Sequence, residues 1–300
     1  MTQISQQTRR TTALDGPSDP WQGCDEATRA DAEAVAARLP VTGRLGVAYS
    51  GGVDSATLLA VAVRALGPDR VVALMGVSPS LAADEADLAR AIAAEAGARL
   101  VEFPTHEGDN PLYRANGADR CFHCKDELFT RIGDDVASAE GLTHVAYGEN
   151  ADDARRIDRP GSRAATEHEV LRPLADAGLT KGRVRALARA LGVRSADKPA
   201  APCLASRIPH GQEVTPQKLQ QVEAAERALR AVGIADSRVR HHGDIARIEV
   251  APTDLATLVA DGVREEVVRA IKAAGFGYVT LDLVGLQSGA FTLQVLTRRG

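Results

Sequence analysis

The sequence has few aromatic residues and no long apolar run. Aromatic residues make up only 3% of the 300 residues, whereas hydrophobic residues make up 44%. The core is therefore expected to be mainly aliphatic, and stacking of bases on aromatic side chains is not expected to be a main binding device. No stretch is long and apolar enough to span a membrane, and the first 20 residues lack the apolar segment of a signal peptide. These absences predict a cytoplasmic protein without a membrane partner.

The sequence also lacks a basic excess and has few cysteines. The formal net charge is -4, whereas a protein that wraps a long nucleic acid normally carries a strong positive charge. Nucleic acid is therefore disfavoured as a partner. The four cysteines of a cytoplasmic protein are expected to be reduced thiols, metal ligands or catalysts rather than disulfides.

Strand and helix patterns alternate along the first two thirds of the chain. Strands are predicted at residues 44–49, 70–76, 99–103 and 144–147. Helices are predicted at residues 25–39, 54–66, 82–96 and 181–191. This alternation predicts an α/β fold with a doubly wound parallel sheet.

The pattern changes after residues 195–209, which contain three prolines and cannot form a regular element. A helix is predicted at 215–232, with Thr215 as N-cap and Pro216 in the first helical position. Strands at 237–241, 246–250 and 278–283 and a helix at 264–274 complete a small α+β unit. We therefore predict three regions: a disordered tail (1–24), an α/β domain (25–200) and a smaller α+β domain (201–300).

Residues 50–55, with the sequence SGGVDS, join a predicted buried strand directly to a helix. Two glycines let the backbone turn tightly and approach a ligand, and the free amides and dipole of a helix start favour a phosphate. Ser50 and Ser55 add hydroxyl donors, and Asp54 can hold a metal ion or the helix start. An ordinary glycine turn is the alternative, but the complete string between strand and helix favours a phosphate-binding loop.

This loop resembles the signature of the N-type ATP pyrophosphatases, the PP-loop family. The resemblance implies ATP and Mg²⁺ as cofactors and cleavage between the α- and β-phosphates, which yields an adenylated substrate and pyrophosphate. A second stretch at 147–153, YGENADD, resembles the GxNxDD stretch of these enzymes. The resemblance implies that ATP is bound by Ser50, Gly51, Gly52, Asp54, Ser55 and Asp152. A Walker loop requires Gly-Lys-Ser/Thr, so a simple kinase or ATPase is disfavoured.

Three of the four cysteines stand in two further motifs. Cys121 and Cys124 form a CxxC, and Cys203 follows a proline-rich stretch. The CxxC spacing lets two thiolates face one metal or one another, and three thiolates suit a 4Fe–4S cluster with one open iron. The alternatives are zinc with His123 as a fourth ligand, a redox pair and simple core packing. A cytosolic CxxC is usually metal-binding or catalytic, which favours the cluster.

Several segments in order resemble the LarE-type ATP-dependent sulfur transferases between about residues 43 and 248. They are AYSGGVDSATLL, DRCFHCKDELF, GENADD with a following RPG, DKPAAPCLASRIPHG and RVRHHGDIARIEV. This family acts in building the nickel-pincer nucleotide cofactor, by converting carboxylates of pyridinium-3,5-biscarboxylic acid mononucleotide into thiocarboxylates. Some members give up the sulfur of one cysteine, and others hold an iron–sulfur cluster on three cysteines. Cys121, Cys124 and Cys203 make this chain similar to the cluster-bearing kind.

The resemblance gives roles to residues beyond the ATP loop. Cys203 and Arg207 are the catalytic candidates: a sulfur nucleophile displaces AMP from an acyl-adenylate, and the neighbouring guanidinium is expected to lower the thiol pKa. The candidate substrate-binding residues are Arg207, Arg238, Arg240, Glu226 and Glu249. Guanidinium groups suit phosphate and carboxylate anions, and the two glutamates match family positions near substrate or a metal ion. Solvated charges on an exposed face are the alternative for each.

The expected partners are a small-molecule nucleotide substrate, further copies of the chain, and a protein or sulfide that supplies sulfur. Two other functions stay open at this point. An iron–sulfur PP-loop tRNA thiolase needs an extended basic surface or an RNA-binding appendage, and the net charge counts against it. A non-catalytic ATP-sensing module would bind ATP without forming pyrophosphate, and the complete loop and three cysteines disfavour it.

Overall fold

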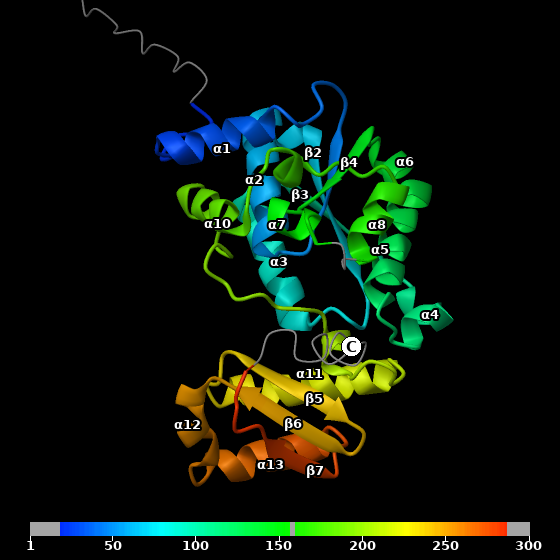
Figure 1. Cartoon of the computed structure of the whole chain (residues 1–300), viewed down its shortest axis with the longest axis vertical. Helices are drawn as coiled ribbons and strands as arrows, with labels where there is room; N and C mark the ends of the chain where they lie inside the picture. Colours follow the sequence, from blue (N-terminus) through cyan, green and yellow to red (C-terminus); the bar gives the residue numbers. More distant parts are fainter. Residues whose placement is uncertain (1–18, 157–159, 287–300) are drawn as a thin grey trace, which may run out of the picture.

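The computed structural model describes residues 19–156 and 160–286 of the chain, and these contain two sheets (Figure 1). Most of the predicted tail, residues 1–18, lies outside the described residues. Within the described part of that tail, Trp21 is buried and packs into the main core cluster. A hydrogen bond from its backbone N–H to Asp19 Oδ1 (3.1 Å) holds the turn that places it there.

The first sheet has four parallel strands in the order β3-β2-β1-β4. Their bounds are β1 Leu45–Ala48, β2 Val71–Val77, β3 Arg99–Pro104 and β4 His144–Tyr147. All four strands were predicted to within two residues at each end. Alternate residues of β2 face opposite sides: Val71, Ala73 and Met75 pack into one core cluster, whereas Val72 and Leu74 pack into another.

Helices cover both faces of this sheet, so the predicted α/β architecture is confirmed (Figure 1). One group is α1 Glu26–Ala36, α2 Val53–Leu66, α3 Ala83–Glu95 and α10 Lys181–Ala190. The other group includes α5 Arg120–Arg131, α6 Ala137–Glu140 and α8 Pro160–Glu167. Short helices are α4 Pro111–Arg114, α7 Ala151–Ala154 and α9 Pro173–Asp176. In the part of the chain that the structure describes, no helix is long and apolar enough to cross a membrane.

The second sheet follows the proline-rich segment and has the order β5-β6-β7. Its elements are α11 Pro216–Ala231, β5 Ser237–His242, β6 Ile245–Val250, α12 Leu255–Val259, α13 Val263–Ala273 and β7 Tyr278–Leu281. The β5 and β6 strands are antiparallel, whereas β6 and β7 are parallel. Thr215 caps α11 as predicted, because its side chain accepts a hydrogen bond from the backbone N–H of Lys218.

A separate apolar cluster lies between the elements that surround the first sheet and those that surround the second. It includes Tyr113 of α4, Leu204 and Ile208 of the proline-rich segment, and Leu219 of α11, with Cys124 of α5 packed against it. This cluster buries residues from both predicted domains against each other. It therefore fixes the proline-rich residues 195–209 relative to the first sheet. Because these residues include Cys203, we call them the Cys203 segment.

Candidate active site

A cavity of about 730 Å³ extends from the phosphate loop to the second sheet. Its wall includes these residues from the predicted site: Ser50, Gly52, Asp54, Cys203, Arg207, Glu226 and Arg238. The cavity thus joins the predicted ATP loop to the predicted sulfur and substrate residues. Other predicted site residues are not among those that line it: Gly51, Ser55, Asp152, Cys121, Cys124, Arg240 and Glu249.

The phosphate loop has the tight geometry that its glycines predict. Gly51 has a φ of 72°, and a Cβ there would lie 2.7 Å from Ala89 Cβ and 2.9 Å from Ala89 Cα, so a larger residue is excluded. Ser55 Oγ accepts from the backbone N–H of Ser50 (3.2 Å) and donates to the carbonyl of Gly52 (3.1 Å). Gly52 is the N-cap of α2 and gives it no side-chain cap. The first amides of α2 are therefore available to a phosphate.

The end of β4 presses against this loop. A Cβ on Gly148 would lie 2.5 Å from the backbone nitrogen of Ser55 and 2.7 Å from the carbonyl carbon of Asp54. Asn150 caps α7 by accepting from the backbone N–H of Asp153 (3.0 Å), and its amide donates weakly to Asp54 Oδ1 (3.4 Å). The segment 148–153 therefore packs against the phosphate loop and supports its conformation.

Asp152 and Lys181 link the same segment to α10. Asp152, assigned to ATP by the sequence, lies at the surface and accepts a hydrogen bond from the backbone N–H of Lys181 (2.8 Å). The Lys181 ammonium pairs with Asp54 Oδ2 at 2.5 Å and lines the cavity. Sequence reasoning missed Lys181. A signal was present, because a cation at the first position of a helix is unfavourable to the helix dipole and so suggests another role.

Of the three predicted cluster cysteines, only Cys203 lines the cavity. Cys121 and Cys124 are the second and fifth residues of α5, at its N-terminal end. Desolvation raises the pKa of Cys124 well above the ordinary thiol value, and the negative charges of Glu107, Cys203 and Cys121 raise it further. Among the described residues, no group of three or more His, Cys, Asp or Glu side chains is arranged to hold a metal ion.

Arg207 lowers the pKa of the Cys203 thiol, as predicted, but desolvation outweighs this effect, so the pKa is raised overall. Although Cys203 is exposed as a residue, the protein around its thiol desolvates it, and this is the main reason that its pKa is raised. Arg120 opposes this increase, Cys121 adds to it, and Arg207 opposes it more weakly than Arg120 does. The thiolate is therefore less populated at neutral pH than that of a free cysteine.

Arg120 and Asn116 hold the segment that carries Cys203, and sequence reasoning missed both. The buried Arg120 guanidinium donates to the carbonyl of Ala205 (2.8 Å) and to Asn116 Oδ1 (2.6 Å). The Asn116 amide donates to the carbonyls of Ile208 (3.2 Å) and Pro209 (2.9 Å). The contacts with Ala205, Ile208 and Pro209 join residues 85 to 93 positions apart, so no local sequence pattern could reveal them.

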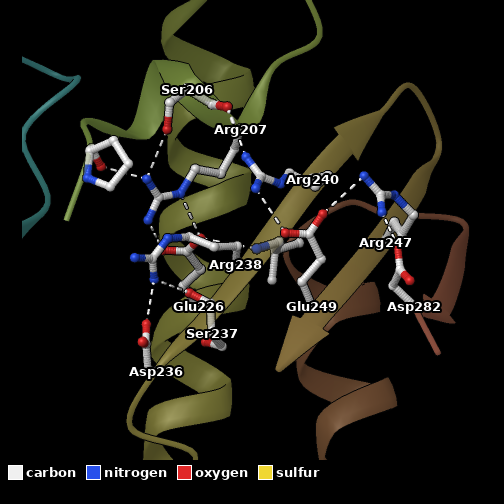
Figure 2. Close-up of polar contacts among 12 residues, drawn as sticks. Ser206, Arg207, Glu226, Asp236, Ser237, Arg238, Arg240, Arg247, Glu249 and Asp282 are labelled. Carbon is white, nitrogen blue, oxygen red and sulfur yellow. Dashed lines mark hydrogen bonds and ion pairs between the residues drawn. The ribbon is translucent and has the colours of Figure 1, made fainter. Parts of the chain in front are cut away.

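Arg207 and Glu226 form a buried ion pair on the cavity wall (Figure 2). Arg207 donates to both carboxylate oxygens of Glu226, at 2.8 and 3.0 Å. It also donates to the carbonyls of Pro202 (2.5 Å) and Cys203 (3.2 Å). Arg207 therefore fixes the main chain on both sides of the cysteine peptide and carries a neutralised charge.

Arg238 and Arg240 point from the same face of β5, because Val239 between them packs into the core on the other face. Arg238 lines the cavity and donates to Asp236 (2.7 Å) and to the carbonyl of Ala200 (3.0 Å). Arg240 is buried against Glu249 at 2.8 Å (Figure 2). Of the two arginines, Arg238 alone lies on the cavity wall.

The chain matches a known family over most of its length. A family model described as asparagine synthase matches residues 29–247. Together with the SGGVDS loop between β1 and α2 and the parallel sheet, this match defines the chain as a PP-loop ATP pyrophosphatase.

Three relatives narrow this class. An uncharacterised protein of Synechocystis sp. is 43% identical over 252 residues, which cover 84% of this chain and 92% of that protein. A pyridinium-3,5-bisthiocarboxylic acid mononucleotide synthase of Lactiplantibacillus plantarum is 35% identical over 246 residues, 82% of this chain and 88% of the synthase. An uncharacterised protein of Methanocaldococcus jannaschii is 30% identical over 168 residues, 56% of this chain and 64% of that protein. The chain belongs to the LarE-type ATP-dependent sulfur transferases, which adenylate the group that receives sulfur.

Proposed function

We propose that this enzyme converts carboxylates of pyridinium-3,5-biscarboxylic acid mononucleotide into thiocarboxylates, as a step in nickel-pincer nucleotide biosynthesis. The observation that carries the proposal is the shared cavity, whose wall includes both the phosphate loop at Ser50–Asp54 and the thiol-bearing Cys203. An acyl-adenylate formed at one end can meet sulfur at the other without leaving the protein. The similarity to the Lactiplantibacillus plantarum synthase supports the choice of substrate.

The proposed reaction begins with ATP on the phosphate loop. The loop amides and hydroxyls hold the phosphates, and the Asp54 carboxylate offers an oxygen ligand to Mg²⁺, which prefers such ligands. A carboxylate oxygen of the substrate attacks the α-phosphorus, and pyrophosphate departs with the electron pair of the broken bond. A sulfur nucleophile presented at Cys203 then attacks the acyl carbon, and AMP leaves with the carboxyl oxygen. A sulfide gives the thiocarboxylate directly. With the Cys203 thiolate as nucleophile a thioester forms first, and the thiocarboxylate departs when the Cα proton is removed and the Cβ–Sγ bond breaks, so that position 203 becomes dehydroalanine.

Arg238 and Arg207 are proposed to bind the anionic groups of the substrate. Both lie on the cavity wall on the Cys203 side, where guanidinium groups can receive a phosphate or a carboxylate. Arg207 already has Glu226 as a partner, so it binds a further anion only by sharing its donors. Arg240 and Glu249 are proposed to support this site through the β5–β6 pair, since they contact each other rather than the cavity.

We also propose that Cys121, Cys124 and Cys203 hold a 4Fe–4S cluster, which would supply a bound sulfide. The support is the packing of Cys124 against the apolar cluster that contains Leu204, the residue after Cys203, and the chemistry of the donor set. The side chains are not arranged for a metal ion as they stand, so binding requires the thiols to draw together. The test is iron and acid-labile sulfide content after anaerobic purification, beside Cys121→Ala/Cys124→Ala. Absence of iron after reconstitution would leave the thiol of Cys203 itself as the sulfur source.

The choice of acceptor is tested by AMP formation. We expect AMP and pyrophosphate to form with ATP, Mg²⁺ and the pyridinium biscarboxylate mononucleotide, and not with total tRNA in its place. The control variant is Gly133→Ala, which adds a methyl group in open space away from the cavity. It should form AMP as the wild type does. AMP formation that depends on tRNA, with a matching gel shift, would replace the proposal by a tRNA thiolase.

A further inference from the structure

Two cations on one face of α10 line the cavity together with residues of the phosphate loop. Lys181 is the first residue of α10 and Arg185 follows one turn later, so their side chains share a face of the helix. Both belong to the cavity wall, together with Ser50, Gly52 and Asp54 of the loop. Neither has a role in the adenylation described above.

The Lys181–Asp54 contact is suited to exchange. The ammonium and the carboxylate are 2.5 Å apart, and their side chains are 37% and 19% exposed. Such a partly solvated pair contributes little to stability, and a lysine ammonium is a compact charge on a flexible stem. Lys181 can therefore leave Asp54 for a phosphate oxygen without movement of the backbone, which frees the carboxylate for a cation.

Arg185 contacts only main-chain carbonyls among the partners that the structure describes for it. It donates to the carbonyls of Ala196 and Lys198, the latter at 2.9 Å. The nearby Asp197 accepts its hydrogen bond from Arg189 instead (2.8 Å). Arg185 forms no ion pair with a carboxylate among the described residues, although its charge helps Arg189 to lower the pKa of the Asp197 carboxyl.

We propose that Lys181 and Arg185 bind the pyrophosphate leaving group, with Lys181 exchanging Asp54 for a phosphate oxygen when ATP is bound. When the bond between the α-phosphorus and the bridging oxygen breaks, the electron pair goes to pyrophosphate. Cations placed where that charge develops lower the barrier, and Lys181 and Arg185 line the same cavity as the phosphate loop that leads into α2, whose first amides favour a phosphate. This inference rests on the adenylation step alone and not on the identity of the acceptor.

The same guanidinium connects the phosphate side of the cavity to the sulfur side. Its carbonyl partners, Ala196 and Lys198, lie in the segment that runs directly to Cys203. A pyrophosphate that draws on Arg185 therefore competes with the contacts that hold this segment. The position of Arg185 makes it a binding residue for the leaving group as well as a support of the Cys203 segment.

The test uses the whole enzyme with pyrophosphate and AMP as separate probes. Lys181→Met and Arg185→Met keep the length of the side chain and remove its charge. Each is expected to weaken pyrophosphate binding by about tenfold, the loss of one charged hydrogen bond, while AMP binding stays unchanged. Arg185→Lys should fall between the wild type and Arg185→Met. Calorimetric titration with each probe gives both affinities, and no acceptor substrate is needed.

The matched control is Arg189→Met, on the same helix but paired with Asp197 away from the cavity. It should leave both affinities unchanged. Equal losses for pyrophosphate and AMP would mean that the two residues only support the fold of the loop, and this would overturn the proposal. Unchanged pyrophosphate binding in both methionine variants would overturn it as well. If a methionine variant does not fold, Lys181→Gln and Arg185→Lys answer the same question.

Discussion

Arg207 and Glu226 form a bidentate ion pair in which both side chains are almost fully buried, at 5% and 4% exposure. Glu226 also accepts a hydrogen bond from the backbone N–H of Val239 at 3.0 Å. The pair therefore ties the Cys203 segment, α11 and β5 together at one point of the cavity wall. A residue predicted to activate a thiol turns out to hold the main chain that carries it.

The first prediction concerns the stability that this pair provides. Arg207→Met leaves the Glu226 carboxylate buried without its cation, which is expected to cost about 3 kcal/mol of unfolding free energy. Arg230→Met breaks the partly exposed pair with Asp84 (3.2 Å) and should cost less than about 1 kcal/mol. Urea denaturation followed by circular dichroism measures both. Equal costs would show that burial of the Arg207 pair is not what matters.

A second prediction concerns the contact between Gly148 and the phosphate loop. Gly148→Ala places a methyl group against the backbone of Asp54 and Ser55, so one of the two segments must move. ATP-dependent formation of AMP should be lost while the far-ultraviolet circular dichroism spectrum stays native. Gly133→Ala, whose added Cβ meets no atom within 4 Å, should keep its activity. An active Gly148→Ala enzyme would mean that the β4 end does not position the loop.

The raised pKa of Cys203 gives a third prediction, for iron-free protein. Because only the thiolate reacts with iodoacetamide, and because a raised pKa keeps the thiol protonated to higher pH, alkylation of Cys203 should be slow at neutral pH. Its midpoint should lie above the value of about 8.5 for a free cysteine. Mass spectrometry of the Cys203 peptide across a pH series measures this midpoint.

Two variants separate the charges around the same thiol. Arg120→Met removes the stronger of the two opposing cations, so the alkylation midpoint should rise further, whereas Arg120→Lys keeps the charge and should change it less. Arg207→Met should raise the midpoint by a smaller amount. A midpoint below that of free cysteine in the wild type would contradict the pKa direction that the structure gives.

The phosphate-loop half of the site could be predicted because its signals are local. A buried strand, two glycines and a helix start follow one another directly in residues 45–66, so each local preference supports the same turn. The first position of α10 also carried a readable signal, since Lys181 stands where the helix dipole disfavours a cation. We interpret that misplaced charge as the mark of a ligand site.

The sulfur half of the site could not be derived in the same way. The segment that carries Cys203 is held by Asn116 and Arg120, which precede Cys203 by more than 80 residues. Asn116 also adopts a φ of 55°, which the local sequence does not indicate. The charge of Arg207 is neutralised by Glu226 of α11. The sequence predicts the bounds of α11 but does not show which residues this helix packs against. Tertiary contacts decide both features, and residue types alone show only that charges are present.

The central claim is that sulfur reaches an adenylated carboxylate at Cys203. The most direct test incubates anaerobically purified enzyme with ATP, Mg²⁺ and the pyridinium biscarboxylate mononucleotide, and follows thiocarboxylate and AMP by mass spectrometry. Cys203→Ser should still release AMP but form no thiocarboxylate, and Cys24→Ser, which changes a thiol outside the cavity wall, should form both. Thiocarboxylate formation by Cys203→Ser, or its absence from the wild type despite AMP release, would contradict the account.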